Sequence, residues 1–156
     1  RTCHIPRDFT FRRELYFQAG GFDSRYPIYE DWDFKLRLSA LVDFYYTGLE
    51  GVAYRRHGTG LSAAPIPHHL RWQRRVFCRN RRMVAPPARR KALSALTHQW
   101  DDMRRRYLHQ YLGGHGSPLW AWRYWINLKT RGLPAPAWKR MLLRARHIST
   151  DPEEKQ

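Results

Sequence analysis

Residues 20–38 read Gly-Gly-Phe-Asp-Ser-Arg-Tyr-Pro-Ile-Tyr-Glu-Asp-Trp-Asp-Phe-Lys-Leu-Arg-Leu, a glycine turn followed by an amphipathic segment. This pattern predicts a helix over about residues 30–42 that opens with two acids, Glu30 and Asp31. Asp31, Phe34, Leu38 and Leu41 follow the spacing i, i+3, i+7 and i+10, which places them on one helical face. We therefore expect Asp31 to head the face that packs against the core.

A carboxylate at the mouth of a packed interior is suited to act as a general base. A structural role explains the same residue equally simply, because the helix dipole favours acids in a first turn. Asp31 can also pair with Lys35 at i+4. The residues alone leave both interpretations open.

Charge divides the 156-residue chain into two parts. Residues 1–64 carry 9 Lys and Arg against 8 Asp and Glu, whereas residues 65–156 carry 20 against 5. The second part is a polycation, which attracts phosphate-rich partners such as nucleic acid, anionic lipid or a nucleotide. The length suits one domain with a substantial core.

Residue types predict a change of secondary structure near Pro65. Before it, we expect a short helix at 12–19 that ends at Gly20-Gly21, and two strands at 42–47 and 52–57. After it, we expect helices at 67–84, at 88–112, beginning at Ser117-Pro118, and around Trp138 to Leu143.

Neither a run of 18 apolar residues nor a signal peptide is found in the sequence. Cys3 and Cys78 are the two cysteines and have no metal-ligand spacing. They fit a reducing compartment better than a disulfide framework, although a bridge between them stays open. We expect a cytoplasmic location.

A second stretch that could form a functional site is Tyr-Arg-Arg-His-Gly at residues 54–58, which is followed by a glycine-rich loop. Arg55 and Arg56 suit a diphosphate through their charge and the exposed backbone N–H groups beside them. A lone His57 is more often a hydrogen-bonding residue than a metal ligand. A solvated basic turn is the simpler alternative.

Taken in order and with their spacing, the Gly-Gly-Phe-Asp turn, the Glu-Asp-Trp-Asp helix start and the Tyr-Arg-Arg-His-Gly stretch resemble family 2 glycosyltransferases. The resemblance covers about residues 8–64 and implies an α/β fold, the C-terminal part of a Rossmann-like GT-A domain. Residues 1–64 would then be the acceptor side of a catalytic domain, 65–150 a basic α-helical extension and 151–156 a frayed tail.

The resemblance also implies roles for the acceptor side. Asp31 would be the base that deprotonates the acceptor hydroxyl, with Glu30 as its neighbour. Trp32 would pack beside the acceptor or the helix. The residues implied to line the acceptor site are those of the turn: Gly20, Gly21, Phe22 and Asp23.

On the donor side, the resemblance implies that His57 completes a divalent metal site, Mn²⁺ or Mg²⁺, at the diphosphate of a nucleotide-sugar. Arg55 and Arg56 would contact the same diphosphate. Family members place an Asp-x-Asp motif on that metal from an N-terminal half that this sequence does not contain. Asp31-Trp32-Asp33 has the same spacing but lies on the helix of the acid pair. We therefore expect a C-terminal portion of an inverting glycosyltransferase, inactive alone and without metal until the other half is present.

The basic extension contains a dense aromatic stretch at residues 119–129. Trp and Tyr interleaved with Arg and Lys are typical of a helix at a membrane interface, which favours peripheral attachment to the inner face of an anionic membrane and a lipid-linked acceptor. The same stretch could instead form a bundle core with Leu119, Trp122 and Ile126 inward. An alternative for the whole chain is a basic helical module that binds nucleic acid or a membrane surface without catalysis.

Overall fold

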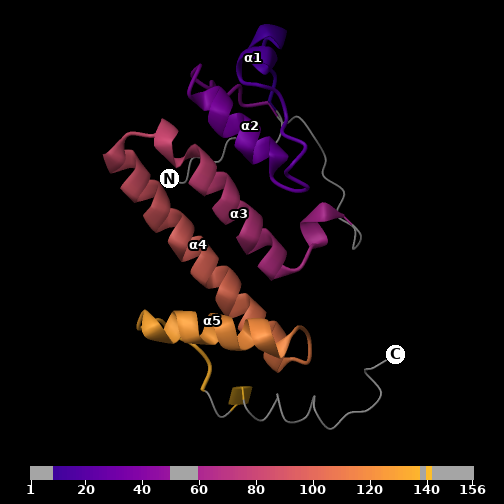
Figure 1. The fold of residues 1–156 in the computed structure, drawn as a ribbon, viewed down its shortest axis with the longest axis vertical. Coiled ribbons are helices and arrows are strands. Elements are labelled where there is room, and N and C mark those ends of the chain that lie inside the picture. The colour runs from indigo at the N-terminus through magenta and orange to yellow at the C-terminus, as the bar shows by residue number, and fades with distance from the viewer. Residues whose placement is uncertain (1–8, 50–59, 138–139, 142–156) are drawn as a thin grey trace. The chain divides into compact units, whose positions relative to one another are not determined.

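The computed structural model describes residues 9–49, 60–137 and 140–141 (Figure 1). Over these ranges the secondary structure is helical. The elements are α1 (Arg13–Gln18), α2 (Glu30–Ser39), the 3-10 helix η1 (Leu61–Ala63), α3 (Ile66–Asn80), the 3-10 helix η2 (Arg81–Met83), α4 (Pro86–Leu112) and α5 (Pro118–Thr130).

The expected α/β Rossmann-like fold is wrong for the described part of the chain, which contains helices and no strand. Residues 42–47 have the composition of a strand but adopt irregular backbone, and the rings of Tyr45 and Tyr46 are exposed. A strand requires a hydrogen-bonded neighbouring strand, and the described residues offer this segment none. The second expected strand, 52–57, lies outside the described residues.

The short helix α1 ends as the glycine pair predicts. Gly20 and Gly21 have φ of +78° and +62°, and Gly21 N donates to Tyr16 O at 2.8 Å. The chain then turns and enters α2, whose inner face carries Phe34 and Leu38. These two side chains form a small core with Ala19, which joins α1 and α2 into one packed element.

Helix α3 packs against α2. It begins at Ile66 with Pro67 in its first turn, where a missing N–H costs nothing, and it buries Leu70 and Val76. The helix ends at Asn80, earlier than the expected Val84, and continues as η2. Pro86 and Pro87, expected to end this run, instead begin α4.

The described residues divide into two compact units, one up to Arg89 and one from Arg90 onward. The division falls within α4, rather than at residue 64 where the composition changes. The reason is that α3 belongs by packing to the unit that contains α2, despite its basic composition.

The second unit is built on α4 and α5. Their connection is fixed by Tyr107, whose hydroxyl accepts a hydrogen bond from Ser117 N at 2.8 Å. Ser117 occupies the N-cap position of α5 as expected, but its side chain makes no capping bond. The buried Asp101 pairs with Arg104 at 2.6 Å and with Arg131, just beyond α5, at 2.7 Å.

The face of α5 that is buried differs from the face that the sequence analysis considered as a bundle core. Ala121, Tyr124 and Leu128 are buried, whereas Leu119 and Ile126 are 73% and 52% exposed. Residues 140–141 are helical, and the rest of the expected helix around Trp138 lies outside the described residues. Across the described ranges, no helix combines the length and apolar character needed to cross a membrane.

Candidate functional site

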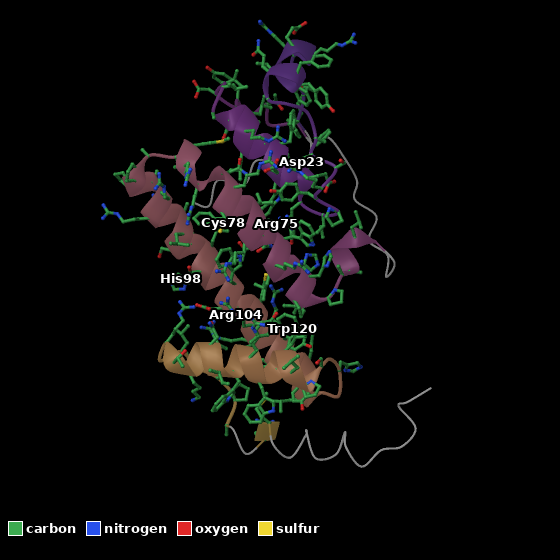
Figure 2. All side chains as sticks on the ribbon, viewed as in Figure 1. Asp23, Arg75, Cys78, His98, Arg104 and Trp120 are labelled. Atoms are coloured by element: carbon green, nitrogen blue, oxygen red, sulfur yellow. The ribbon has the colours of Figure 1, made fainter. Side chains whose placement is uncertain are left out.

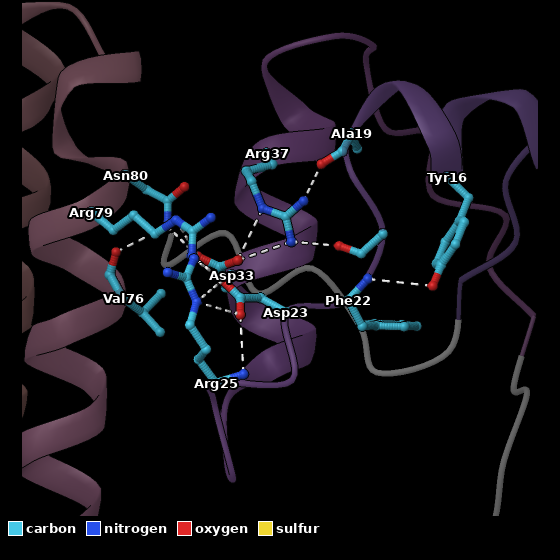
Figure 3. A network of polar contacts seen from close by, with 11 residues as sticks. Tyr16, Ala19, Phe22, Asp23, Arg25, Asp33, Arg37, Val76, Arg79 and Asn80 are labelled. Atoms are coloured by element: carbon cyan, nitrogen blue, oxygen red, sulfur yellow. Dashed lines mark hydrogen bonds and ion pairs between the residues drawn. The ribbon is translucent and has the colours of Figure 1, made fainter.

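The glycine turn is held to α2 by one arginine, Arg37 (Figure 3). Its guanidinium donates to the carbonyl oxygen of Ala19 and, at 2.7 Å, to that of Gly21. Its Nε donates to Asp33 Oδ2 at 2.9 Å, and Nη2, which donates to Gly21, also lies 2.9 Å from that oxygen in an ion pair. One buried side chain thus fixes the turn relative to the helix that carries the acid pair.

Glycine is required at the second position of this turn. A Cβ on Gly21 would lie 2.9 Å from the Tyr16 ring, and φ is in the left-handed region that other residues rarely adopt. The Tyr16 hydroxyl is 3.5 Å from the backbone N–H of Phe22. The ring of Phe22 packs against that of Phe34 at a centroid distance of 4.8 Å, tilted by 49°, and remains half exposed.

Asp33 also joins the turn to α3. It is fully buried, and its Oδ1 accepts a hydrogen bond from Asn80 Nδ2 at 2.8 Å. The Nε of Arg79 lies 3.8 Å from the same oxygen. A buried charge is tolerated only with such pairing, so Asp33 is a structural carboxylate.

Asp23, the acid of the turn, is paired twice. Arg25 donates from Nε to Oδ1 at 2.9 Å and from Nη2 to Oδ2 at 2.8 Å, and Arg79 donates from Nη1 to Oδ2. These hydrogen bonds, first those of Arg25 and then those of Arg79, hold the pKa of Asp23 well below its usual range. Asp23 stays ionised and serves as an anchor for two guanidinium groups.

The acid pair lies at the start of α2, where Glu30 and Asp31 are both partly exposed. Asp31 Oδ2 is 3.3 Å from Lys35 Nζ, and the Asp31 side chain is 37% exposed. The ammonium of Lys35 also lies over the ring of Phe9 at 4.8 Å. A ligand that approaches from solvent can therefore reach the Asp31 carboxylate.

The inward face of α2 differs from the one predicted. Asp33, rather than Asp31, is the carboxylate in the interior, beside Phe34 and Leu38. Leu41, expected to continue the same face, lies beyond the helix end at Ser39 and is half exposed. The buried Arg37 explains the difference, because it needs an anion one turn before it and Asp33 occupies that position.

Tyr29, immediately before the acid pair, has left-handed backbone with φ +67° and ψ +18°. Its hydroxyl accepts a hydrogen bond from Gln73 Nε2 at 2.9 Å and lies 2.7 Å from His69 Nδ1. Burial raises the pKa of this hydroxyl, and the nearby charge of Asp31 raises it further, against the hydrogen bond from Gln73. A strained non-glycine residue held by two partners is a typical mark of a functional site.

Trp32 packs its ring against that of Tyr29 at a centroid distance of 5.1 Å. The two rings lie in the first turn of α2 with the acid pair, and both are only partly buried. An aromatic pair beside an accessible carboxylate offers an apolar face and a proton acceptor to the same ligand.

The first compact unit thus brings the turn residues and the acid pair together. Arg55, Arg56 and His57 lie outside the described residues, so their predicted contacts with a diphosphate and a metal stay predictions. Within the described ranges, no three side chains of His, Cys, Asp or Glu meet in a group that could hold a metal ion.

Several residues of this site were not identified from the sequence. The i, i+4 spacing of Asp33 and Arg37 was a visible signal for their pairing. By contrast, Asn80 and His69 reach their partners across 47 and 40 residues, and no local pattern predicts those contacts.

Comparisons with protein-family models, curated proteins and solved structures found no match for this chain.

Proposed function

We propose that this chain supplies the acceptor side of an inverting glycosyltransferase, with Asp31 as the base. The donor would be a nucleotide-sugar and the acceptor a carbohydrate or lipid-linked hydroxyl. The proposal keeps the resemblance of the motifs to family 2 glycosyltransferases and does not depend on strands within the described residues.

The observation that supports it most is the Arg37 clamp. Arg37 ties the carbonyl oxygens of Ala19 and Gly21 to α2 through Asp33, so the turn and the acid pair form one rigid element. Rigid placement of a base relative to its substrate is what general base catalysis requires. The network is buried, while Asp31 remains accessible.

The chemistry assigned to these residues is simple. As the acceptor oxygen attacks the anomeric carbon of the donor, its proton passes to a carboxylate oxygen of Asp31. The bond between the anomeric carbon and the diphosphate oxygen breaks on the opposite face, so the configuration inverts. Trp32 and Tyr29 would hold the acceptor through their ring faces while the proton moves.

The leaving diphosphate requires a separate site. The resemblance assigns this role to Arg55, Arg56 and a divalent metal at His57, which would neutralise the charge that develops on the leaving group. These residues lie outside the described ranges, and the metal would need further ligands.

The test is transfer by the natural polypeptide that carries this segment, measured as release of nucleoside diphosphate from a panel of nucleotide-sugars. We expect Asp31→Asn to lower acceptor-dependent turnover by about 100-fold or more, the usual scale for loss of a general base. Glu14→Gln, which removes an exposed acid of α1, is the matched control and should leave turnover unchanged. Retained turnover in Asp31→Asn would contradict the assignment.

One observation favours a second function, attachment to an anionic membrane through α5. Leu119 and Ile126 are exposed on this helix, and the half-buried Trp122 and Trp125 rings lie 5.7 Å apart. Arg123 is also exposed. Apolar and aromatic side chains beside cations match the interface of a bilayer with negative headgroups.

Flotation with vesicles tests this attachment. We expect binding to phosphatidylcholine vesicles that contain phosphatidylserine, weaker binding to pure phosphatidylcholine, and loss of binding in Ile126→Glu. Equal binding to both vesicle types, or a tighter association with DNA than with anionic vesicles, would contradict it and favour a nucleic-acid partner.

A further inference from the structure

A basic groove lies between the Asp23 turn and α3 in the first compact unit. It has a volume of about 500 Å³ and is lined by Arg25, Tyr26, Arg75, Cys78 and Arg79. Asp23, Arg75 and Cys78 are labelled in Figure 2. Three of the five lining residues are arginines, and none of the five belongs to the predicted acceptor or donor site.

Two of these arginines, Arg25 and Arg79, are held in place by the carboxylate of Asp23. Asp23 accepts hydrogen bonds from both Arg25 and Arg79, and its side chain is only 12% exposed, against 73% for Arg25 and 37% for Arg79. The carboxylate therefore lies below the two guanidinium groups, which keep further N–H donors toward solvent. Two cations that would otherwise repel one another are held side by side before any ligand arrives.

The third arginine carries an uncompensated charge. Arg75 lies over the ring of Trp72 at 5.1 Å and forms no ion pair with any residue that the structure describes. It is one helical turn before Arg79 on α3, so both side chains project on the same face. Stacking on Trp72 orients the Arg75 guanidinium without neutralising it.

The side chains that line the groove carry more positive than negative charge. Asp23 offsets one of the three lining arginines, and the buried Asp33, which lies 3.8 Å from Arg79 Nε, is already paired with Arg37 and Asn80. The groove therefore offers converging guanidinium groups with a surplus of positive charge. A guanidinium group can donate two parallel hydrogen bonds to two oxygens of one phosphate. The exposed Arg74 on the same helix differs, because it does not line the groove and is not held by an anchoring carboxylate among the described residues.

We propose that this groove is a binding site for a phosphate monoester or diphosphate group. The inference does not depend on sugar transfer, because binding can be measured on this chain without donor or acceptor. A soluble phosphate compound and the phosphate headgroup of a lipid share the required chemistry, and the experiment below separates them.

Cys78 provides a reporter inside the groove. Its thiol is exposed and unbridged, and Cys3 is the other cysteine of the chain, so a Cys3→Ser background leaves one reactive thiol. We expect inorganic pyrophosphate to slow alkylation of Cys78, whereas sodium chloride at equal ionic strength should not. The ratio of rates with and without pyrophosphate gives the dissociation constant for each variant.

Arg75→Gln is the decisive variant because it removes a cation with no described ion pair. We expect it to weaken pyrophosphate binding about tenfold, the scale of one charge-assisted hydrogen bond. Arg74→Gln, which removes the same charge from the neighbouring position outside the groove, should change binding less than twofold. Arg25→Gln should weaken binding as Arg75→Gln does, and the melting temperature of each variant, taken on the same sample, detects a folding defect.

Vesicles of phosphatidylcholine with phosphatidic acid form the second arm. Protection of Cys78 by these vesicles that is lost in Arg75→Gln supports the site and identifies a lipid phosphate as its source. Protection by pyrophosphate alone supports the site with a soluble phosphate as its source. Absence of protection in both arms, or equal losses in Arg74→Gln and Arg75→Gln, would overturn the proposal.

Discussion

Among the residues that the structure describes, each compact unit contains one buried aspartate paired with arginine, and the two pairs serve different purposes. Asp33 in the first unit meets Arg37, whose remaining donors go to backbone carbonyl oxygens of the glycine turn. Asp101 in the second unit meets Arg104 and Arg131, which tie the end of α5 back to α4. The first pair positions a loop beside an accessible acid; the second fastens two helices.

The difference lies in how the arginines are used. Arg37 is almost wholly buried and divides its donors among three acceptors. Arg104 and Arg131 are partly exposed, so water can accept hydrogen bonds from the guanidinium N–H groups that do not reach Asp101. Loss of the carboxylate should therefore damage the two units unequally.

The largest effect is expected for Asp33→Asn. This change leaves the Arg37 charge buried without its counter-ion and should lower the free energy of unfolding by about 3–5 kcal/mol. Urea denaturation followed by circular dichroism measures it, with the exposed Asp43→Asn as control. A loss no larger than that of the control would remove the distinction between the two units.

A smaller loss is expected for Asp101→Asn, because solvent can reach both of its arginines. We expect about 1.5–3 kcal/mol, the scale of one hydrogen bond to a charged group. The neighbouring Asp102→Asn is a matched control, since Asp102 is 66% exposed and pairs with Arg105 only at the surface. If Asp101→Asn destabilises the chain more than Asp33→Asn, the comparison is reversed.

The two units should also differ in their response to pH. The pKa of Asp23 is lower folded than unfolded, so its contribution to stability is complete above the unfolded pKa, about 4, and is lost as the pH falls below it. Burial, helped by the neighbouring Tyr107, raises the pKa of Tyr124 to about 12, so its contribution is present below pH 10 and is lost between about pH 10 and 12.

Melting temperatures across pH test this pair of expectations. Asp23→Asn should flatten the decline on the acid side alone, and Tyr124→Phe the decline on the alkaline side alone. An unchanged acid limb in Asp23→Asn would mean that its pairing with Arg25 and Arg79 does not stabilise the fold.

Local patterns in the sequence predicted much of the helical structure. The glycine pair after α1, the acids that open α2 and Ser117-Pro118 before α5 are signals within one helical turn, and each marks an element of the structure. The strand at 42–47 was wrong because Tyr45 and Tyr46 favour a strand by type but have no described neighbouring strand to pair with.

The candidate site was only partly predictable for a related reason. The turn and the acid pair are contiguous motifs, whereas the contacts of Asp33 with Asn80 and of Tyr29 with His69 depend on how α3 packs against α2. The interior position of Asp33 followed from the same packing. Helical periodicity predicted Asp31 on the inner face, and this was wrong, because Asp33 is the buried carboxylate.

The smallest effect on stability is expected for Asp31→Asn, the variant that also tests Asp31 as the general base. Asp31 is the ion-pair partner of Lys35, whose side chain is only 5% exposed, but asparagine keeps an oxygen that can accept a hydrogen bond from Lys35 Nζ, so the replacement should cost about 1 kcal/mol. The measurement is acceptor-dependent turnover of Asp31→Asn in the natural polypeptide, with its melting temperature taken on the same sample. Turnover should fall by about 100-fold or more in a sample that stays folded at the assay temperature. Full turnover, or a loss that merely follows unfolding, would contradict the assignment of Asp31 as the base.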